Sequence, residues 1–347
     1  MAKRNQYLII DNIKLFLLLG VVSIHCNVLT SDAVYLTSLG ANAVIFFSST
    51  LTRTCVPAFF IISGFLFYQN KFSFQSYKDK LYRRFYTLFI PYMLWNLISL
   101  ILQILKIKYL GFPDHGLFED GSIQWIKVFE GFYNYVDGYP FAFAFWFIRN
   151  LMIFILLSPV AYLISCKKIS IGLIFIFICL ALNTTLWGFS FFIIGGIIAR
   201  YFKNIIFKMS IYPSIACGIL WITVAIINIR FQFDYLSSTY LFIESISSLI
   251  FITYMIKSIK GRAIKSIIEK FVPATFFIYS FHQLYCSVTR NFYIKIFGLD
   301  TSSGIIMAYL SSLITLIGLS YLIWITLKRT CPSVLNILCG NRGNSSF

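Results

Sequence analysis

Long apolar stretches recur along the whole chain, separated by short segments that hold most of the charged side chains. Each stretch has about twenty residues, the length that an α-helix needs to cross the hydrocarbon core of a bilayer. The pattern predicts about ten membrane spans, near residues 7–29, 43–69, 85–105, 145–165, 169–187, 189–202, 211–229, 239–257, 272–293 and 304–327. The fifth and sixth are short and meet at a turn from Asn183 to Gly188, so a single re-entrant hairpin is the alternative there.

Composition agrees with this pattern, since 59% of the residues are hydrophobic and only 12% are charged. The expected fold class is therefore an all-α integral membrane protein, a bundle of about ten transmembrane helices. We interpret residues 1–330 as one membrane-embedded domain and residues 331–347 as a short cytoplasmic tail.

The net charge of +17 is informative because of where the basic residues lie along the chain. Most basic residues lie in alternate connecting segments, which is typical of positive-inside topology and not of a nucleic-acid partner. Both termini are then predicted to be cytoplasmic. The opening segment from Met1 to Arg4 could imitate a signal peptide, but the apolar run that follows contains Asp11 and Lys14 and lacks a small-x-small cleavage site. We expect a retained first helix.

Three ionisable residues interrupt that first span, namely Asp11, Lys14 and His25. A Lys or Asp at the centre of a span costs on the order of 2.5–3.5 kcal/mol, so such residues usually face a bundle interior and have a function. At 100° per residue, the step from Lys14 to His25 returns to within about 20° of the same direction, roughly 16 Å further along the axis. All three residues therefore share one face. The simpler interpretation is an Asp11–Lys14 ion pair beside an unrelated histidine.

Later spans contain further polar residues, which are Arg53, Arg149, Glu244 and His282. Lys14, Arg53 and Arg149 together would cost on the order of 8–10 kcal/mol if nothing compensated them, so the pattern predicts a polar interior pocket. A single histidine inside a membrane more often donates or accepts an interhelical hydrogen bond. Two histidines with cations around them favour catalysis or proton relay.

A basic segment precedes the third span and contains Lys78, Lys80, Arg83 and Arg84. Positive-inside topology and attraction to anionic lipid explain part of it. The sharper interpretation is a binding site for the phosphates of a cytosolic donor, because paired arginines suit bidentate phosphate contacts.

The remaining polar chemistry is sparse. The eight cysteines are scattered singly, with neither a C-x-x-C pair nor the spacing of a disulfide framework, and we expect no metal site. The longest segment between spans, about residues 107–144, is rich in aromatic and acidic residues, and its part 122–133 is predicted to form a short amphipathic helix. Aromatic faces beside carboxylates suit a carbohydrate, whereas an ordinary interfacial aromatic belt explains most of them.

Several segments, taken in order, carry a resemblance to a known family. They are Lys14 and His25 with ten residues between them; Arg53 followed by Val56-Pro57-Ala58-Phe59-Phe60 and Ser63-Gly64; Lys80-Leu81-Tyr82-Arg83-Arg84; Ile90-Pro91-Tyr92; Trp146 with Arg149 and Ser158-Pro159; and Tyr279 with His282. Their order and spacing resemble the acyltransferase-3 family of integral membrane acyltransferases, which includes bacterial polysaccharide O-acetyltransferases. The resemblance covers residues 5 to about 328. Two positions depart from it, because many members have arginine in place of Lys14 and an acidic residue in place of Asn150.

The resemblance implies an enzyme of the cell membrane that moves an acyl group, here expected to be acetyl, from acyl-CoA to a hydroxyl of a cell-surface or lipid-linked glycan. It further implies that His25 is the general base or acyl carrier, and that Asp11 and Lys14 belong to the same catalytic face. Arg53 and Arg149 neutralise the oxyanion or grip the donor, and His282 is a second base or a hydrogen-bonding support. Lys78, Lys80, Arg83 and Arg84 would bind the donor phosphates.

Two other classes share the predicted architecture. A multi-pass transporter would move a glycan or lipid precursor without consuming acyl-CoA, and a non-catalytic assembly subunit would bind a partner and tolerate loss of His25. The expected partners of the acyltransferase are the acyl-CoA donor, the glycan acceptor and membrane lipids, with no nucleic acid. Polysaccharide-assembly proteins or a second copy of the chain are further candidate partners.

Overall fold

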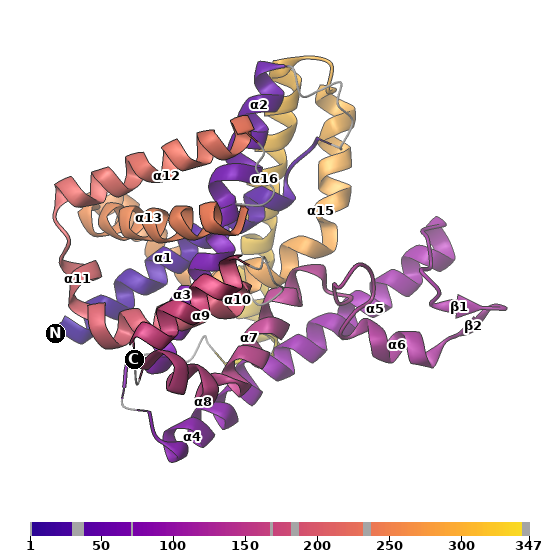
Figure 1. Ribbon diagram of the computed structural model, residues 1–347. Helices are drawn as coiled ribbons and strands as arrows, with labels where there is room; N and C mark the ends of the chain where they lie inside the picture. Colours follow the sequence, from indigo (N-terminus) through magenta and orange to yellow (C-terminus); the bar gives the residue numbers. More distant parts are fainter. Residues whose placement is uncertain are drawn as a thin grey trace.

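The computed structural model describes residues 2–29, 38–70, 72–166, 169–181, 187–231 and 237–341. Its regular structure is almost entirely helical within these ranges (Figure 1), and α1 (Ala2–His25) and α3 (Cys55–Tyr68) pack against each other and against several other helices. The predicted all-α membrane class is confirmed. Three of the basic residues predicted to be cytoplasmic, Lys167, Lys168 and Arg342, lie outside the described residues. So do residues 183–186 of the predicted turn from Asn183 to Gly188.

The second span changes helical type in its middle. It begins as α2 (Leu39–Ile45), continues through a π-helical segment η2 (Phe46–Leu51) and a 3₁₀ turn η3 (Thr52–Thr54), and ends as α3. Hydroxyl groups bond back to the backbone here, from Ser48 to the Val44 carbonyl at 2.7 Å and from Thr52 to the Ser48 carbonyl at 2.5 Å. Such bonds and π-helical turns bend a helix and recur at functional sites, and Arg53 lies within this segment.

The third span is longer than the sequence predicted. The segments α4 (Phe74–Arg84), η4 (Phe85–Phe89) and α5 (Ile90–Leu110) form a continuous helical stretch of 37 residues. Gly111 adopts φ 67° and ends it, the left-handed conformation that glycine adopts without strain. The predicted tail begins with α17 (Pro332–Leu338), whose Leu338 carbonyl accepts a 3.1 Å hydrogen bond from the indole of Trp95 on α5.

The segment after α5 folds as a small unit of its own. A hairpin of β1 (Phe118–Glu119) and β2 (Ser122–Ile123) leads into α6 (Trp125–Gly131), which is shorter than the predicted helix over 122–133. Leu100, Leu117 and Val128 form a separate small core between α5 and this unit. Figure 1 shows the hairpin and α6 projecting from the rest of the helices beside the end of α5.

The fourth span is bent by 65° where α7 (Trp146–Leu156) meets α8 (Ser158–Ala161), because Pro159 lacks the N–H needed to continue a helix. η6 (Tyr162–Cys166) and α9 (Ile169–Ala181) follow. Next come α10 (Trp187–Ile197), η7 (Ile198–Phe202) and α11 (Lys203–Lys208). Helices α3 and α10 pack closely, since a Cβ on Gly64 or Gly195 would lie 2.0 Å from a backbone carbonyl oxygen of the other helix.

The C-terminal part contains two antiparallel helix pairs. α12 (Ile211–Phe231) packs against α13 (Ser237–Ser258), and α15 (Thr275–Phe297) packs against α16 (Ser302–Thr330). Between the pairs lie the amphipathic helix α14 (Arg262–Phe271) and the turn η9 (Val272–Ala274). α1 contacts α3, α13, α15 and α16, so its side chains face the interior of the bundle on several sides.

Six helices among the described residues are long and apolar enough to cross a membrane, or seven if the bent fourth span is included. α9 and α10 are shorter than a full span, and α15 contains His282, Gln283, Arg290 and Lys295. The predicted count of about ten spans is not confirmed and, with the cytoplasmic placement of both termini, stays a prediction.

Candidate active site

Two of the chain's three histidines meet where α1 ends beside α15. His25 is the last residue of α1, and its imidazole centroid lies 5.3 Å from that of His282, with the rings tilted by 43°. His282 is fully buried, whereas His25 is partly exposed. The sequence predicted both as candidates, and the fold brings them together.

The hydrogen bonding of His282 defines which of its nitrogens is available. Its Nδ1 lies 3.0 Å from the carbonyl oxygen of Ile278. Because a carbonyl only accepts hydrogen bonds, Nδ1 must carry the proton. In the neutral ring, Nε2 is then an acceptor, and it is buried without a hydrogen-bond partner among the described residues. The structure therefore places an unused acceptor beside the His25 ring.

Residues further along α15 hold the end of α1 in place. The Cys286 thiol donates to the carbonyl of His25 at 3.1 Å, and the Arg290 guanidinium donates to the carbonyl of Asn27 at 3.2 Å. The last carbonyls of a helix lack partners within the helix, so these side chains satisfy them, and a cation there also complements the helix dipole. Asn27 in turn donates to the Ser49 hydroxyl at 3.1 Å, which ties this end to η2.

Aromatic side chains cover one side of the histidine pair. Phe143, in the turn η5 (Phe143–Phe145), meets the His25 ring edge to face at 5.8 Å and remains 36% exposed. Tyr139 stacks on Phe143 at 4.0 Å and contacts Trp146 at 6.5 Å. The Tyr279 hydroxyl donates to the Ala144 carbonyl, which fixes η5 to α15. The segment between α6 and α7 thus forms an aromatic wall at His25.

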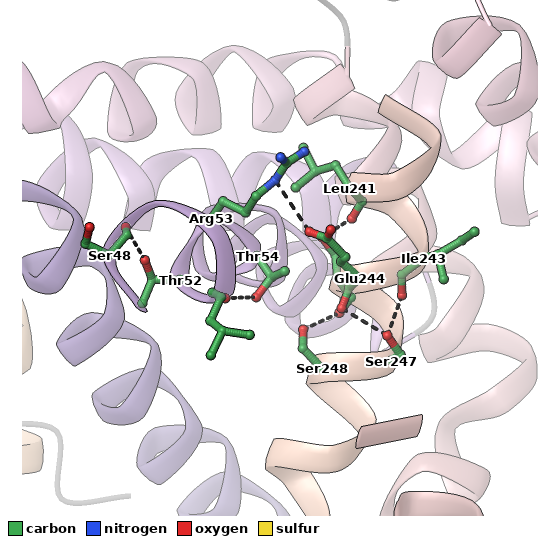
Figure 2. Close-up of polar contacts among 11 residues, drawn as sticks. Ser48, Thr52, Arg53, Thr54, Leu241, Ile243, Glu244, Ser247 and Ser248 are labelled. Carbon is green, nitrogen blue, oxygen red and sulfur yellow. Dashed lines mark hydrogen bonds and ion pairs between the residues drawn. The ribbon is translucent and has the colours of Figure 1, made fainter. Parts of the chain in front are cut away.

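Arg53 lies in the turn η3, which contacts α1, and its side chain faces a different helix. Its Nε is 3.4 Å from Oε2 of Glu244 on α13, and Figure 2 shows the two side chains pointing toward one another. The Glu244 side chain is fully buried, while that of Arg53 is 28% exposed. A carboxylate removed from water is stable only with a compensating charge, which Arg53 supplies. Arg53 is therefore half of an interhelical ion pair.

Asp11 and Lys14 form the ion pair that the simpler interpretation predicted. Their side chains meet at 2.9 Å and are 46% and 33% exposed. They lie in the middle of α1, Lys14 about three turns and Asp11 about four turns before His25. A narrow cavity of about 30 Å³ lies nearby between α1, α3 and α13, but its lining is apolar, with Ile10, Ile13 and Phe65 among the residues.

Arg149 is bound to the segment that bears the aromatic wall. Its Nη1 donates to the carbonyls of Tyr133 and Gly138, the latter at 2.9 Å, and its guanidinium lies 4.5 Å from the centre of the Tyr133 ring. Its Nε donates to Asn150 at 3.2 Å. Through these contacts Arg149 anchors residues 133–138 to α7.

The four basic residues of α4 lie on a helix without buried residues. Lys78 lies over the Phe74 ring at 4.7 Å, and Lys80 lies over the Phe67 ring at 4.3 Å and donates to the Phe67 carbonyl. Arg83 is exposed and Arg84 is partly buried. No cluster of three or more His, Cys, Asp or Glu side chains that could hold a metal ion occurs among the described residues.

Sequence reasoning did not place Glu244, Cys286, Arg290 or Phe143 in the site. Glu244 was recognised as polar but received no role. Arg290 could have been found, because it is a cation in a helix that also contains His282, eight residues before it. The part played by Phe143 depends on how the segment after α6 folds, for which the sequence has no local pattern.

Comparison with known proteins adds one finding. The model of a family described as an acyltransferase domain, acyltransferase-3, matches residues 7–325. Neither a curated protein nor a solved structure gives a significant match. The match covers nearly the whole chain and includes all of the site residues described above, and the protein therefore belongs to the acyltransferase-3 family of membrane acyltransferases.

Proposed function

We propose that this protein is a membrane O-acetyltransferase that moves an acetyl group from acetyl-CoA to a hydroxyl of a cell-surface or lipid-linked glycan. The observation that carries the proposal is the pairing of His25 with His282 beside a partly exposed aromatic wall, in a chain of an acyltransferase family. Aromatic faces pack well against sugar rings, and a histidine is the side chain best suited to take a proton near neutral pH.

The reaction needs a base because an alcohol is a poor nucleophile until its proton is removed. His25 accepts the hydroxyl proton while the hydroxyl oxygen forms a bond to the thioester carbonyl carbon. The tetrahedral intermediate then breaks its carbon–sulfur bond, and the coenzyme A thiolate takes the proton back from His25. The proton taken from the hydroxyl therefore leaves on coenzyme A, and the acetyl group ends on the oxygen of the acceptor.

His282 supports that base through its unused acceptor. If one nitrogen of His25 donates to Nε2 of His282, the other nitrogen is left as a lone pair for the substrate hydroxyl. The ring separation of 5.3 Å is short enough for such an edge-to-edge hydrogen bond. Once His25 has taken the proton, the same bond stabilises its positive charge.

Each basic side chain of the site has a proposed role in catalysis, anchoring or donor binding. Arg53, in a turn that contacts α1, neutralises the negative oxygen of the intermediate. Arg149 anchors the segment that forms the acceptor side of the site. Lys14 lies three turns toward the start of α1 and binds the thioester arm of the donor, while Lys78, Lys80, Arg83 and Arg84 bind its phosphates. No metal takes part.

We further propose that the protein lies in the cell membrane, where it contacts the surrounding lipids. Acetyl-CoA would reach the site from the cytosol. No nucleic acid is a partner, because the basic residues follow the alternate connecting segments of a membrane protein. Polysaccharide-assembly proteins or a second copy of the chain are the protein partners proposed.

The experiment is to supply radiolabelled acetyl-CoA to membranes from cells with and without the protein, and to measure label in surface polysaccharide together with free coenzyme A. Equal release of coenzyme A and gain of label, both dependent on the protein, are the expected result. Glycan movement across the membrane without coenzyme A release would instead identify a transporter, and absence of both would favour an assembly subunit.

A further inference from the structure

The Arg53–Glu244 pair lies beside the C-terminal part of α1, the helix that ends in His25. Asn27, just after α1, is hydrogen-bonded to Ser49 at 3.1 Å. One turn or more toward the start of α1, Gly20 is so close to the same segment that a Cβ would lie 2.3 Å from the Cys55 sulfur and 3.6 Å from Cβ of Thr52. The chain from Ser49 to Cys55 therefore runs along α1 from Asn27 to Gly20. Arg53 lies between Thr52 and Cys55 and therefore beside Gly20, about 7.5 Å before His25 along α1.

Glu244 reaches Arg53 from a separate helix. α13 contacts both α1 and η3, so its side chains approach the same segment from another side. Neither Glu244 oxygen accepts a hydrogen bond from a described residue. The neighbouring serines do not serve it, because Ser247 donates to the carbonyls of Ile243 and Glu244 and Ser248 donates to that of Ser245. The guanidinium of Arg53 is the cation that the buried carboxylate faces.

The two partners are unequally exposed, and this difference indicates how the pair works. Glu244 is fully buried and lies on a regular helix, whereas Arg53 is 28% exposed and lies in a 3₁₀ turn after a π-helical segment. A long arginine side chain has many rotamers, and a fixed buried carboxylate selects among them. A catalytic cation must be held within about 0.5 Å of its productive position to be effective.

We infer that Glu244 is a positioning residue, which holds the guanidinium of Arg53 beside the C-terminal part of α1 so that it can neutralise the oxyanion; this inference rests on the proposed function. Glu244 does not touch either substrate and takes no proton. Its effect on transfer passes through Arg53 alone.

The test compares Glu244→Gln, Glu244→Asp and the control Ser247→Ala in membranes given labelled acetyl-CoA, with rates divided by the amount of folded protein. Gln keeps the size of the side chain but removes the charge, so kcat should fall about 10- to 100-fold while KM for acetyl-CoA changes less than about threefold. Asp keeps the charge and should recover much of the rate. Ser247 is buried on the same helix but bonds only to backbone carbonyls, so its variant should match the native chain.

A purely structural ion pair would give a different result, because less folded Glu244→Gln protein would form but each folded molecule would have the native kcat. That result would overturn the inference while leaving the proposed function intact. The double variant Arg53→Glu with Glu244→Arg adds a second check, since it restores an ion pair without an arginine at position 53. Recovery of folding without transfer is expected, and recovery of both would overturn the inference. A native chain that transfers no acetyl would contradict the proposed function and the inference together.

Discussion

The imidazole rings of His25 and His282 lie 5.3 Å apart at the point where α1 ends against α15. His282 donates through Nδ1 to the carbonyl of Ile278, and its Nε2 is a buried acceptor without a hydrogen-bond partner among the described residues. The Ile278 carbonyl satisfies one of the two nitrogens of His282 inside the bundle. In the mechanism that we propose, a hydrogen bond from His25 to this Nε2 leaves the other nitrogen of His25 free to accept the substrate proton.

Replacing His282 tests that partnership. His282→Ala removes the acceptor for His25, so we expect kcat for acetyl transfer to fall about 10²-fold, within the range for groups that assist general base catalysis. The expected change in KM for acetyl-CoA is small, because the proposed role of His282 is to support His25 and not to bind the donor. Rates are measured with labelled acetyl-CoA on variants matched for folded protein. A His282→Ala variant with the native kcat would exclude His282 from the mechanism.

Arg149 is expected to matter through the segment that it anchors. Arg149→Lys keeps a positive charge but cannot reach two carbonyls and the Tyr133 ring at once. Loss of such hydrogen bonds costs about 1–3 kcal/mol, so residues 131–142 should exchange their amide hydrogens faster in Arg149→Lys than in the native chain. Hydrogen–deuterium exchange followed by mass spectrometry measures this directly. Unchanged exchange in that segment would show that the anchor is unimportant.

The close contact of α3 and α10 predicts an unequal response among glycines. Gly64→Ala places a Cβ 2.0 Å from the Phe192 carbonyl oxygen, so the helices must separate, at a cost of about 1–3 kcal/mol. A Cβ on Gly318 of α16 would meet no heavy atom within 4 Å, so Gly318→Ala should be neutral or stabilising by about 0.5–1 kcal/mol. Thermal unfolding of the purified variants in detergent measures both. Equal melting temperatures would contradict the packing described.

Lys14 offers a test of donor binding that is separate from the chemistry at His25. If Lys14 binds the thioester arm, Lys14→Met should raise KM for acetyl-CoA about tenfold and lower kcat much less. The reason is that the lost contact would stabilise the bound substrate and the transition state equally. Asp11→Asn is the matched variant, because it removes the partner of Lys14 at 2.9 Å and keeps the lysine. A large fall in kcat with unchanged KM would place Lys14 in the chemical step instead.

The sequence predicted the individual polar residues better than their partners. His25, His282 and Arg53 stood out because ionisable groups in apolar spans are costly. The pairing of Arg53 with Glu244 could not be predicted, because it depends on α13 packing beside the second span. The role of Arg149 depends on the fold of residues 131–142, which hydropathy does not define. The count of spans stayed uncertain for a related reason, since hydropathy does not separate short apolar helices such as α9 from helices that cross a membrane.

The central claim is that His25 is the base for acetyl transfer. The most direct measurement is label transferred from acetyl-CoA to surface polysaccharide by the native chain, by His25→Ala and by the control His115→Gln, all at equal amounts of folded protein. His115 is exposed in the segment before the hairpin, far along the chain from the paired histidines. We predict that His25→Ala loses transfer and that His115→Gln retains it. Transfer by His25→Ala at the native rate would contradict the role of His25 as the base.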